Sequence, residues 1–364
     1  PAISWPAHPE RCAPAGGSRQ IFRFQRVESL PPVSRADEAA RGAIQTANWI
    51  CFNKNHLAQR EIEAVLRHLR HTVAILIYVA CVFLGAALLS PLAWKAVFSD
   101  WAFLSFLNEH DDFHRYFNRC LLGLALLGLG LLCRFSAIKS WSEIGWAHPG
   151  KNLPWLGKGL LLGLASLTAA AALPLLSGAR EMLPTPALAE WARHLANALL
   201  AGVLVAVIEG TLFRGVPFGL LRRDLPWRWA ALAGSLFFAA MHFLDQKPEL
   251  EFITWTSGFS ALPTMVHDFA NDPYSAAKFI NLTLAGIILC ALWQRTGNLY
   301  CSIGAHAGWI FCLKTNGFLT QSTAESPSAF WGNGQISDGW AATPLLALML
   351  WYIVQSNEEP PQPD

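Results

Sequence analysis

Three ionisable side chains interrupt long apolar stretches of the sequence and could do chemistry together. Glu209 follows LLAGVLVAVI, His242 ends SLFFAAMH, and His306 lies within YCSIGAHAGWIF. In a membrane helix, a charge near the bilayer centre costs at least about 2.5–3.5 kcal/mol, so such residues are candidates for function by default. A desolvated carboxyl group can accept a proton from water, and an imidazole can hold that water or stabilise an oxyanion.

The same side chains are compatible with other roles. Glu209, His242 and His306 could bind zinc and leave a position open for water, although the sequence contains no HExxH motif. Glu209 could instead neutralise Arg214, and each histidine could be a hydrogen-bonded core residue. The residue types and spacing therefore leave protease, transporter and ion-coupled carrier open.

The composition indicates a membrane protein. The chain has 364 residues, of which 53% are hydrophobic and 14% charged, whereas an average soluble protein has about 25% charged residues. The 16 Trp suit bilayer interfaces, and the 27 Gly and 22 Pro suit packed transmembrane helices. A formal net charge of +2 gives no indication of nucleic-acid binding. The 8 Cys include no CxxC spacing, so neither a thiolate metal site nor a disulfide framework is expected.

The hydropathy pattern predicts an all-α fold, a polytopic transmembrane helical bundle of about eight spans, because a span needs roughly 20 mostly apolar residues. The predicted spans lie at about 72–92, 117–137, 155–177, 195–220, 228–244, 276–294, 299–314 and 340–356. The depths of Glu209, His242 and His306 along their spans overlap, so one shared cavity is expected. The polar segment 245–275 is interpreted either as an interfacial helix or lid, or as an external loop. Basic residues before the first span and after the second and fourth place both termini in the cytoplasm.

Three motifs carry a family resemblance. The first is Glu209-Gly-Thr-Leu-Phe-Arg214, the second is Phe238-Ala-Ala-Met-His242, and the third begins at His306 and ends at Ile310. In order, and each on a predicted membrane helix, they resemble the EExxxR, FxxxH and HxxxN motifs of the CPBP intramembrane proteases. That family includes type II CAAX prenyl endopeptidases and bacterial abortive-infection or bacteriocin self-immunity proteins. The resemblance covers about residues 195–315.

The resemblance implies roles for the matching residues. Glu209 would be the general base that activates water, His242 would help hold the water, and His306 would help stabilise the oxyanion. Arg214 would support Glu209, and Phe238 would complete the second motif. Members of the family have been described both as metalloproteases and as metal-independent glutamate proteases. The resemblance therefore allows either no cofactor or a zinc ion held by Glu209, His242 and His306.

Two positions depart from the family pattern. Gly210 replaces the second Glu of the first motif, and Ile310 replaces the polar residue that often ends the third. Because Ile cannot donate a hydrogen bond, part of the expected oxyanion hole is missing, and losing one such donor typically costs about 10²–10³ in rate. Asn281, in the sixth predicted span, is the candidate to replace that donor.

The chain is accordingly interpreted as four segments. Residues 1–70 are a polar leader, disordered or spurious, ending in a short amphipathic helix near 56–70. Residues 71–190 hold N-terminal transmembrane helices, 191–318 a CPBP-like catalytic core, and 319–364 a C-terminal transmembrane helix with an acidic tail.

The expected function is that of an intramembrane endopeptidase. It would hydrolyse a peptide bond of a membrane-associated or lipidated substrate in the bacterial inner (plasma) membrane, with the bilayer and that substrate as partners. The alternative is a catalytically weak or inactive scaffold or immunity factor of the same fold, which Gly210 and Ile310 favour. A proton-coupled transporter ranks last, because no second copy of any motif indicates the internal repeat typical of such carriers.

Overall fold

The computed structural model describes residues 69–98, 113–244, 252–323, 329–332 and 335–355. The predicted leader, apart from its last two residues, lies outside these ranges, as do the amphipathic helix near its end and the acidic tail. The described residues from 69 onward belong to one compact unit of the chain.

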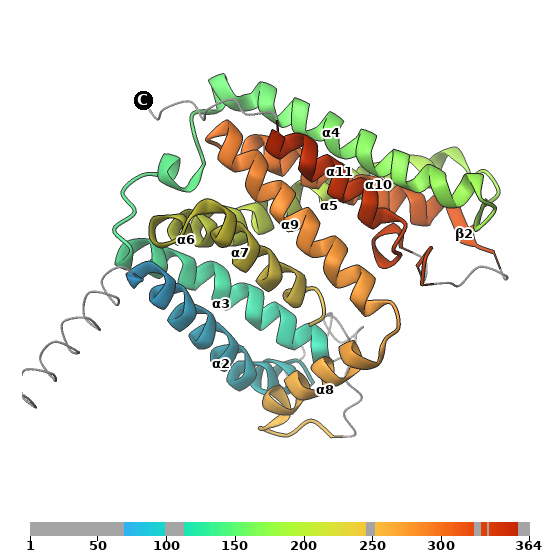
Figure 1. Cartoon of the computed structure of the whole chain (residues 1–364). Helices are drawn as coiled ribbons and strands as arrows, with labels where there is room; N and C mark the ends of the chain where they lie inside the picture. The colour runs from blue at the N-terminus through green and yellow to red at the C-terminus, as the bar shows by residue number, and fades with distance from the viewer. Residues whose placement is uncertain (1–68, 99–112, 245–251, 324–328, 333–334, 356–364) are drawn as a thin grey trace, which may run out of the picture. The chain divides into compact units, whose positions relative to one another are not determined.

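Helices make up almost all of the described structure, which confirms the all-α prediction (Figure 1). The longer helices are α2 (Arg70–Phe98), α3 (Phe113–Phe135), α4 (Pro149–Leu176), α5 (Leu188–Glu209), α9 (Ser275–Thr296) and α10 (Tyr300–Leu319). The shorter ones are α6 (Gly219–Asp224), α7 (Trp227–Met241), α8 (Ser257–Asn271) and α11 (Ala342–Gln355), with the helical turns η2 (Trp141–Ile144), η3 (Gly210–Phe218) and η4 (Ile336–Asp338). Two short antiparallel strands, β1 (Arg180–Met182) and β2 (Thr320–Ser322), pair Arg180 with Ser322 and Met182 with Thr320.

The predicted count of eight spans is not confirmed. Among the described residues, five helical stretches are long and apolar enough to cross a membrane: Arg70–Ala96, Phe113–Phe135, Trp141–Leu176, Leu188–Asp224 and Ser275–Thr296. Helices α7 and α11 have 15 and 14 residues, fewer than the roughly 20 that a span needs. Helix α10 has 20 residues, but its histidine, lysine and asparagine side chains lower its mean hydropathy.

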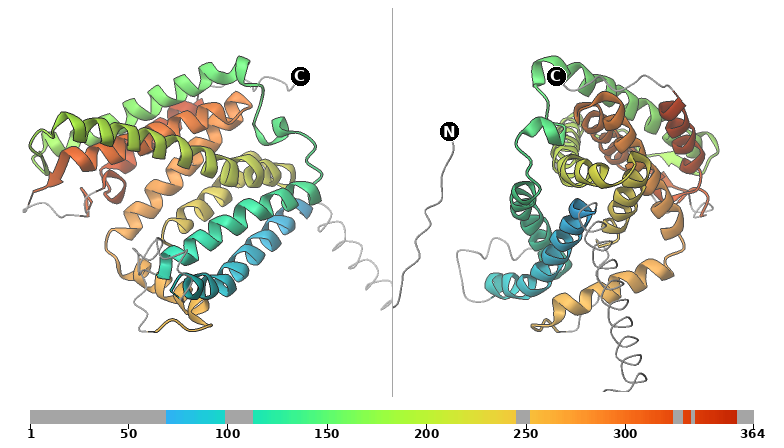
Figure 2. Two further views of the ribbon diagram at one scale, coloured as in Figure 1. Left: turned by 180° about the vertical axis from the view of Figure 1, so that it is seen from behind. Right: turned by 60° about the vertical axis from the view of Figure 1, so that its left-hand side comes forward.

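The helices form two groups that meet around the candidate site. Helix α4 packs along α10, which also contacts α5, and α11 packs on α9. Helix α2 packs on α3; α6 contacts α2, η3 contacts α3, and α7 contacts α9 as well as α6 and η3. In Figures 1 and 2, α6 and α7 lie between the α2–α3 pair and the α4–α10 pair, while α8 crosses near the lower end of α2.

Glycines allow the backbones of α4 and α10 to touch. A methyl group at Gly159 or Gly163 would overlap the carbonyl groups of Cys301 and Ala305, respectively. On α10, a methyl group at Gly304 would overlap the backbone of α4 in the same way. Small residues at both surfaces are the usual means of close helix packing in membranes. This contact fixes the part of α10 that carries His306.

The segment between the fifth and sixth predicted spans contains helix α8. Its first turn lies against α2, because a methyl group at Gly258 would overlap the backbone of Ala87. Just before the helix, the Trp255 ring centroid lies 4.3 Å from Nζ of Lys95 at the end of α2. The prediction of a helix is confirmed for Ser257–Asn271, and the alternative of an ordinary loop is wrong there. Its location at the membrane interface stays a prediction.

Candidate active site

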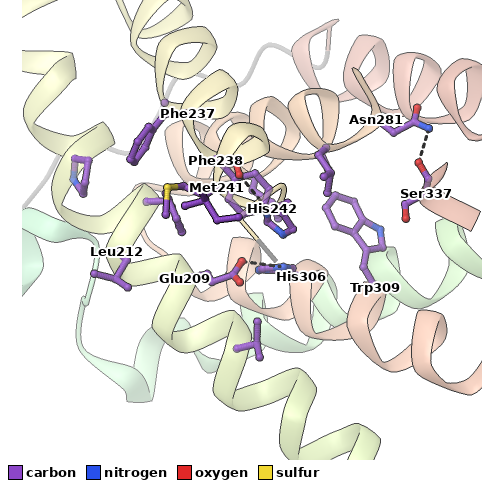
Figure 3. Close-up of a pocket in the computed structure, with 18 of the residues that line it drawn as sticks. Glu209, Leu212, Phe237, Phe238, Met241, His242, Asn281, His306, Trp309 and Ser337 are labelled. Atoms are coloured by element: carbon purple, nitrogen blue, oxygen red, sulfur yellow. Dashed lines mark hydrogen bonds and ion pairs between the residues drawn. The ribbon is translucent and has the colours of Figure 1, made fainter. Parts of the chain in front are cut away.

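Glu209, His242 and His306 line one cavity of about 780 Å³ (Figure 3). Glu209 is the last residue of α5, His242 follows the last residue of α7, and His306 lies in the first half of α10. Oε2 of Glu209 is 3.7 Å from Nε2 of His306. The sequence therefore brings residues from three helices to the wall of a single cavity.

The FxxxH motif fixes the orientation of His242. Nδ1 of His242 lies 2.9 Å from the carbonyl oxygen of Phe238, one helical turn earlier. A carbonyl oxygen can only accept a hydrogen bond, so Nδ1 must carry the proton of the pair. In the neutral imidazole, Nε2 is then the acceptor.

The ring of Phe238 lies at the centre of the candidate site. It makes edge contacts with the rings of His242, at 4.4 Å between centroids, and His306, at 6.2 Å. The guanidinium carbon of Arg214 lies 3.9 Å from the Phe238 centroid. Phe238 therefore links the cation to both imidazoles, a role that the FxxxH motif alone does not reveal.

Arg214 is almost completely buried, with 1% of its surface exposed. It is absent from the residues that line the cavity. Its side chain interacts electrostatically with Glu209 and lies close to the thiol of Cys290. It is therefore placed to act on Glu209 from behind the cavity wall rather than on a ligand inside it.

Several polar atoms of this group make no hydrogen bond within the described residues. They are Oε2 of Glu209, Nδ1 of His306 and both Nη atoms of Arg214. Buried polar atoms usually have hydrogen-bond partners, and exceptions are frequent at catalytic sites. Oε2 of Glu209 and the His306 ring are thus free to bind a polar group that enters the cavity.

Asn281 lines the cavity, but its side chain is already engaged in hydrogen bonds. Nδ2 donates to the carbonyl oxygens of Ser337 and Gly339, each at 2.9 Å, and Oδ1 accepts a hydrogen bond from Oγ1 of Thr343 at 2.7 Å. Both amide hydrogens are therefore engaged in holding η4 and the start of α11. In Figure 3 the ring of Trp309 lies between Asn281 and His306. These contacts argue against Asn281 as a replacement oxyanion donor.

Ile310 lines the cavity one turn after His306. Its apolar side chain leaves that part of the wall without a hydrogen-bond donor. Sequence reasoning missed the apolar residues that shape the same wall, among them Phe237, Met241 and Trp309. Met241 and Trp309 lie three residues from Phe238 and His306, respectively, and this helical spacing was the signal that could have identified them.

The zinc alternative is not supported. Among the residues that the structure describes, no group of three or more His, Cys, Asp or Glu side chains could hold a metal ion. A zinc site needs its nitrogen and oxygen ligands about 2.0–2.2 Å from one centre. Glu209, His242 and His306 do not fit that requirement.

Comparison with protein families identifies the class of the chain. Residues 191–312, which hold all three motifs, match the model of the type II CAAX prenyl endopeptidase Rce1-like family. The match supports membership of the CPBP protease family for this region, which is about a third of the chain. Together with the apolar helices, the match makes it an integral membrane protein. Comparisons with curated proteins and with solved structures found no match.

Proposed function

We propose that this protein is an intramembrane endopeptidase in which Glu209 activates a water molecule to hydrolyse a peptide bond. The observation that carries the proposal is the 3.7 Å distance between Oε2 of Glu209 and Nε2 of His306 at the wall of the cavity. That distance exceeds a good hydrogen bond, yet one water molecule at about 2.8 Å can contact both atoms.

The reaction follows from the arrangement of donors and acceptors. Glu209 removes a proton from the water, and the oxygen of the water bonds to the scissile carbonyl carbon. Nε2 of His242 accepts the second hydrogen of the water as a hydrogen bond, because its Nδ1 donates to Phe238. His306 donates a hydrogen bond to the oxyanion that forms. The carboxyl proton of Glu209 then passes to the leaving nitrogen as the C–N bond breaks.

The lining of the cavity supports a membrane-associated or lipidated substrate. Apolar side chains of α2, α3, α7, α9, α10 and α11 dominate the wall, and Glu209 is its one acidic residue among those described. Such a wall suits an apolar chain or a hydrophobic peptide segment better than a polar peptide. The bilayer and such a substrate are therefore the proposed partners. The proposed location is the bacterial inner membrane, and the charge pattern of the loops supports both termini in the cytoplasm.

The alternative, a weak or inactive scaffold or immunity factor, rests on Ile310, which leaves the cavity wall without a donor beside His306. Activity in a purified system separates the two functions. The substrate would be a fluorogenic peptide with a lipidated cysteine, compared with its unlipidated counterpart, in proteoliposomes.

Glu209→Gln should lower the cleavage rate at least about 10²-fold, because general-base catalysis contributes about 10²–10⁴. Glu190→Gln is the matched control, because Glu190 is an exposed carboxylate on the same helix. A chelator should leave the rate unchanged. Full activity in Glu209→Gln would exclude the mechanism, and an inactive parent with an intact fold would favour the scaffold.

A further inference from the structure

A π-helix follows Glu209 directly. The segment η3 spans Gly210–Phe218, between the end of α5 and the start of α6. Fewer than about 1% of residues in globular proteins are π-helical, and most such segments are single turns inside α-helices, frequently at functional sites. A nine-residue example beside the proposed general base therefore calls for a physical reason.

The π geometry changes which residues share a face. In an α-helix with 3.6 residues per turn, side chains five positions apart point about 140° away from each other. A π-helix bonds residues five apart, so they lie one turn above each other. Glu209 and Arg214 are five positions apart, so the π turn that follows Glu209 places them one above the other. The widened turn lets the spacing of this motif place both side chains on one side.

Pro217 and Gly215 both lie within the segment and fit its open geometry. In an α-helix the ring of Pro217 would clash with the carbonyl of Phe213, four residues earlier, at a cost of about 3 kcal/mol. At Gly215, a Cβ would lie 3.2 Å from the carbonyl oxygen of Ile144, so the segment passes close to η2. Thr211 anchors its start, since Oγ1 donates to the Val207 carbonyl at 2.8 Å and accepts from Nε1 of Trp146 at 3.2 Å.

We propose that the π-helical turn Gly210–Phe218 is a positioning element that puts Arg214 on the same side of the helix as Glu209, and that Pro217 keeps this turn open. The turn directs the buried cation to the side of the helix that carries the carboxylate, in surroundings where charges interact strongly. Only the effect on catalysis rests on the proposed protease function. The coupling between the two side chains does not.

Two single-residue deletions test the geometry. Deleting either Leu212 or Val216 removes the extra residue of the π turn and shifts everything downstream equally, and both are buried apolar residues of the same core cluster. Deleting Leu212 shortens the Glu209–Arg214 spacing to four, which shares a face in an α-helix. Deleting Val216 keeps the Glu209–Arg214 spacing at five, and residues five apart do not share a face in an α-helix. The two deletions are therefore matched controls for each other.

The readout is a double-mutant cycle on thermal stability in detergent, using Glu209→Gln and Arg214→Met. We expect non-additive shifts of the melting temperature in the parent and in the Leu212 deletion, and additive shifts in the Val216 deletion. Equal coupling in both deletions, or none in the parent, would overturn the proposal. Cleavage should likewise be retained in the parent and the Leu212 deletion and lost in the Val216 deletion. A parent that shows coupling but does not cleave the substrate would refute only the protease function.

Pro217→Ala repeats the test without changing the chain length, in case the deletions do not fold. The coupling between Glu209 and Arg214 should fall by at least half in Pro217→Ala. The control is Pro174→Ala, which replaces another proline inside a helix, on α4 and outside the cavity lining. It should leave the coupling unchanged. Unchanged coupling in Pro217→Ala would mean that proline does not keep the turn open.

Discussion

The guanidinium carbon of Arg214 lies 3.9 Å from the centroid of the Phe238 ring, whose other aromatic contacts include His242 and His306. A desolvated cation over an aromatic face gains about 2 kcal/mol or more. One aromatic ring thus contacts both the buried cation and the two imidazoles. The second motif of the family thereby supports the first and third.

Replacing Phe238 should damage both stability and catalysis. In Phe238→Ala, the lost packing should destabilise the fold by about 3–5 kcal/mol. Cleavage should fall at least about 10-fold because Arg214 loses its contact with the aromatic ring. Phe238→Leu keeps most of the bulk but no aromatic face, so it should fold and still cleave slowly. Phe237→Ala is the control, because Phe237 lines the cavity but has no ring contact with Arg214 among the described residues. Wild-type cleavage by folded Phe238→Leu would contradict this role.

Ile310→Asn should raise the cleavage rate. The substitution adds a donor to the cavity wall one turn after His306, and a single oxyanion donor is worth up to about 10²–10³ in rate. The gain should appear in kcat rather than in KM, because the donor acts on charge that forms in the transition state. Leu313→Asn, a similar change one turn further along the cavity wall, should give no gain. Equal effects of the two variants would exclude an oxyanion role for position 310.

Helical periodicity explains which parts of the site could be predicted from the sequence. Phe238 and His242, like His306 and Ile310, are four residues apart, so an ordinary α-helix places each pair on one face, as the structure has them. Glu209 and Arg214 are not related in this way. Their shared side depends on a π turn, which requires the contact of Gly215 with Ile144 and the proline at 217.

Long-range contacts explain the surroundings of Asn281, whose role as an oxyanion donor stays a prediction. Asn281 is a polar residue in an apolar helix. Such a residue can belong to a functional site, but it can equally belong to a hydrogen-bond network that only stabilises the fold. Its partners lie more than fifty residues later, in a turn with no sequence signal linking it to α9. The predicted count of eight spans is not confirmed among the described residues, because short apolar helices such as α7 and α11 resemble spans in hydropathy but not in length.

Asn281→Ala should lower the melting temperature but should not slow the turnover of the folded protein as the loss of an oxyanion donor would. The change leaves the carbonyl groups of Ser337 and Gly339 and the hydroxyl of Thr343 without their partner, and each buried unpaired group costs about 1–3 kcal/mol. Thr343→Val removes one of these bonds and should have a smaller effect of the same kind. Melting temperatures and turnover rates of the folded fraction are the measurements. An approximately hundredfold slower turnover, the effect of losing one oxyanion donor, with an unchanged melting temperature would restore the oxyanion role.

Gly163→Ala should displace the part of α10 that carries His306. The added methyl group would overlap the carbonyl of Ala305, the residue before His306, and neither backbone can move without separating α4 from α10. Overpacking of this kind costs about 1–3 kcal/mol, and the change in the 3.7 Å distance between His306 and Glu209 should lower cleavage further.

Gly157→Ala is the matched control for Gly163→Ala. Gly157 lies on the same helix, and a methyl group there meets no atom within 4 Å. Because Ala is favoured over Gly in a helix by up to about 1 kcal/mol, this variant should be as stable as the parent or slightly more so. Melting temperatures and cleavage rates of the two variants, measured side by side, separate helix propensity from backbone contact. If Gly163→Ala matched Gly157→Ala in both, the close packing of α4 on α10 would not set the position of His306.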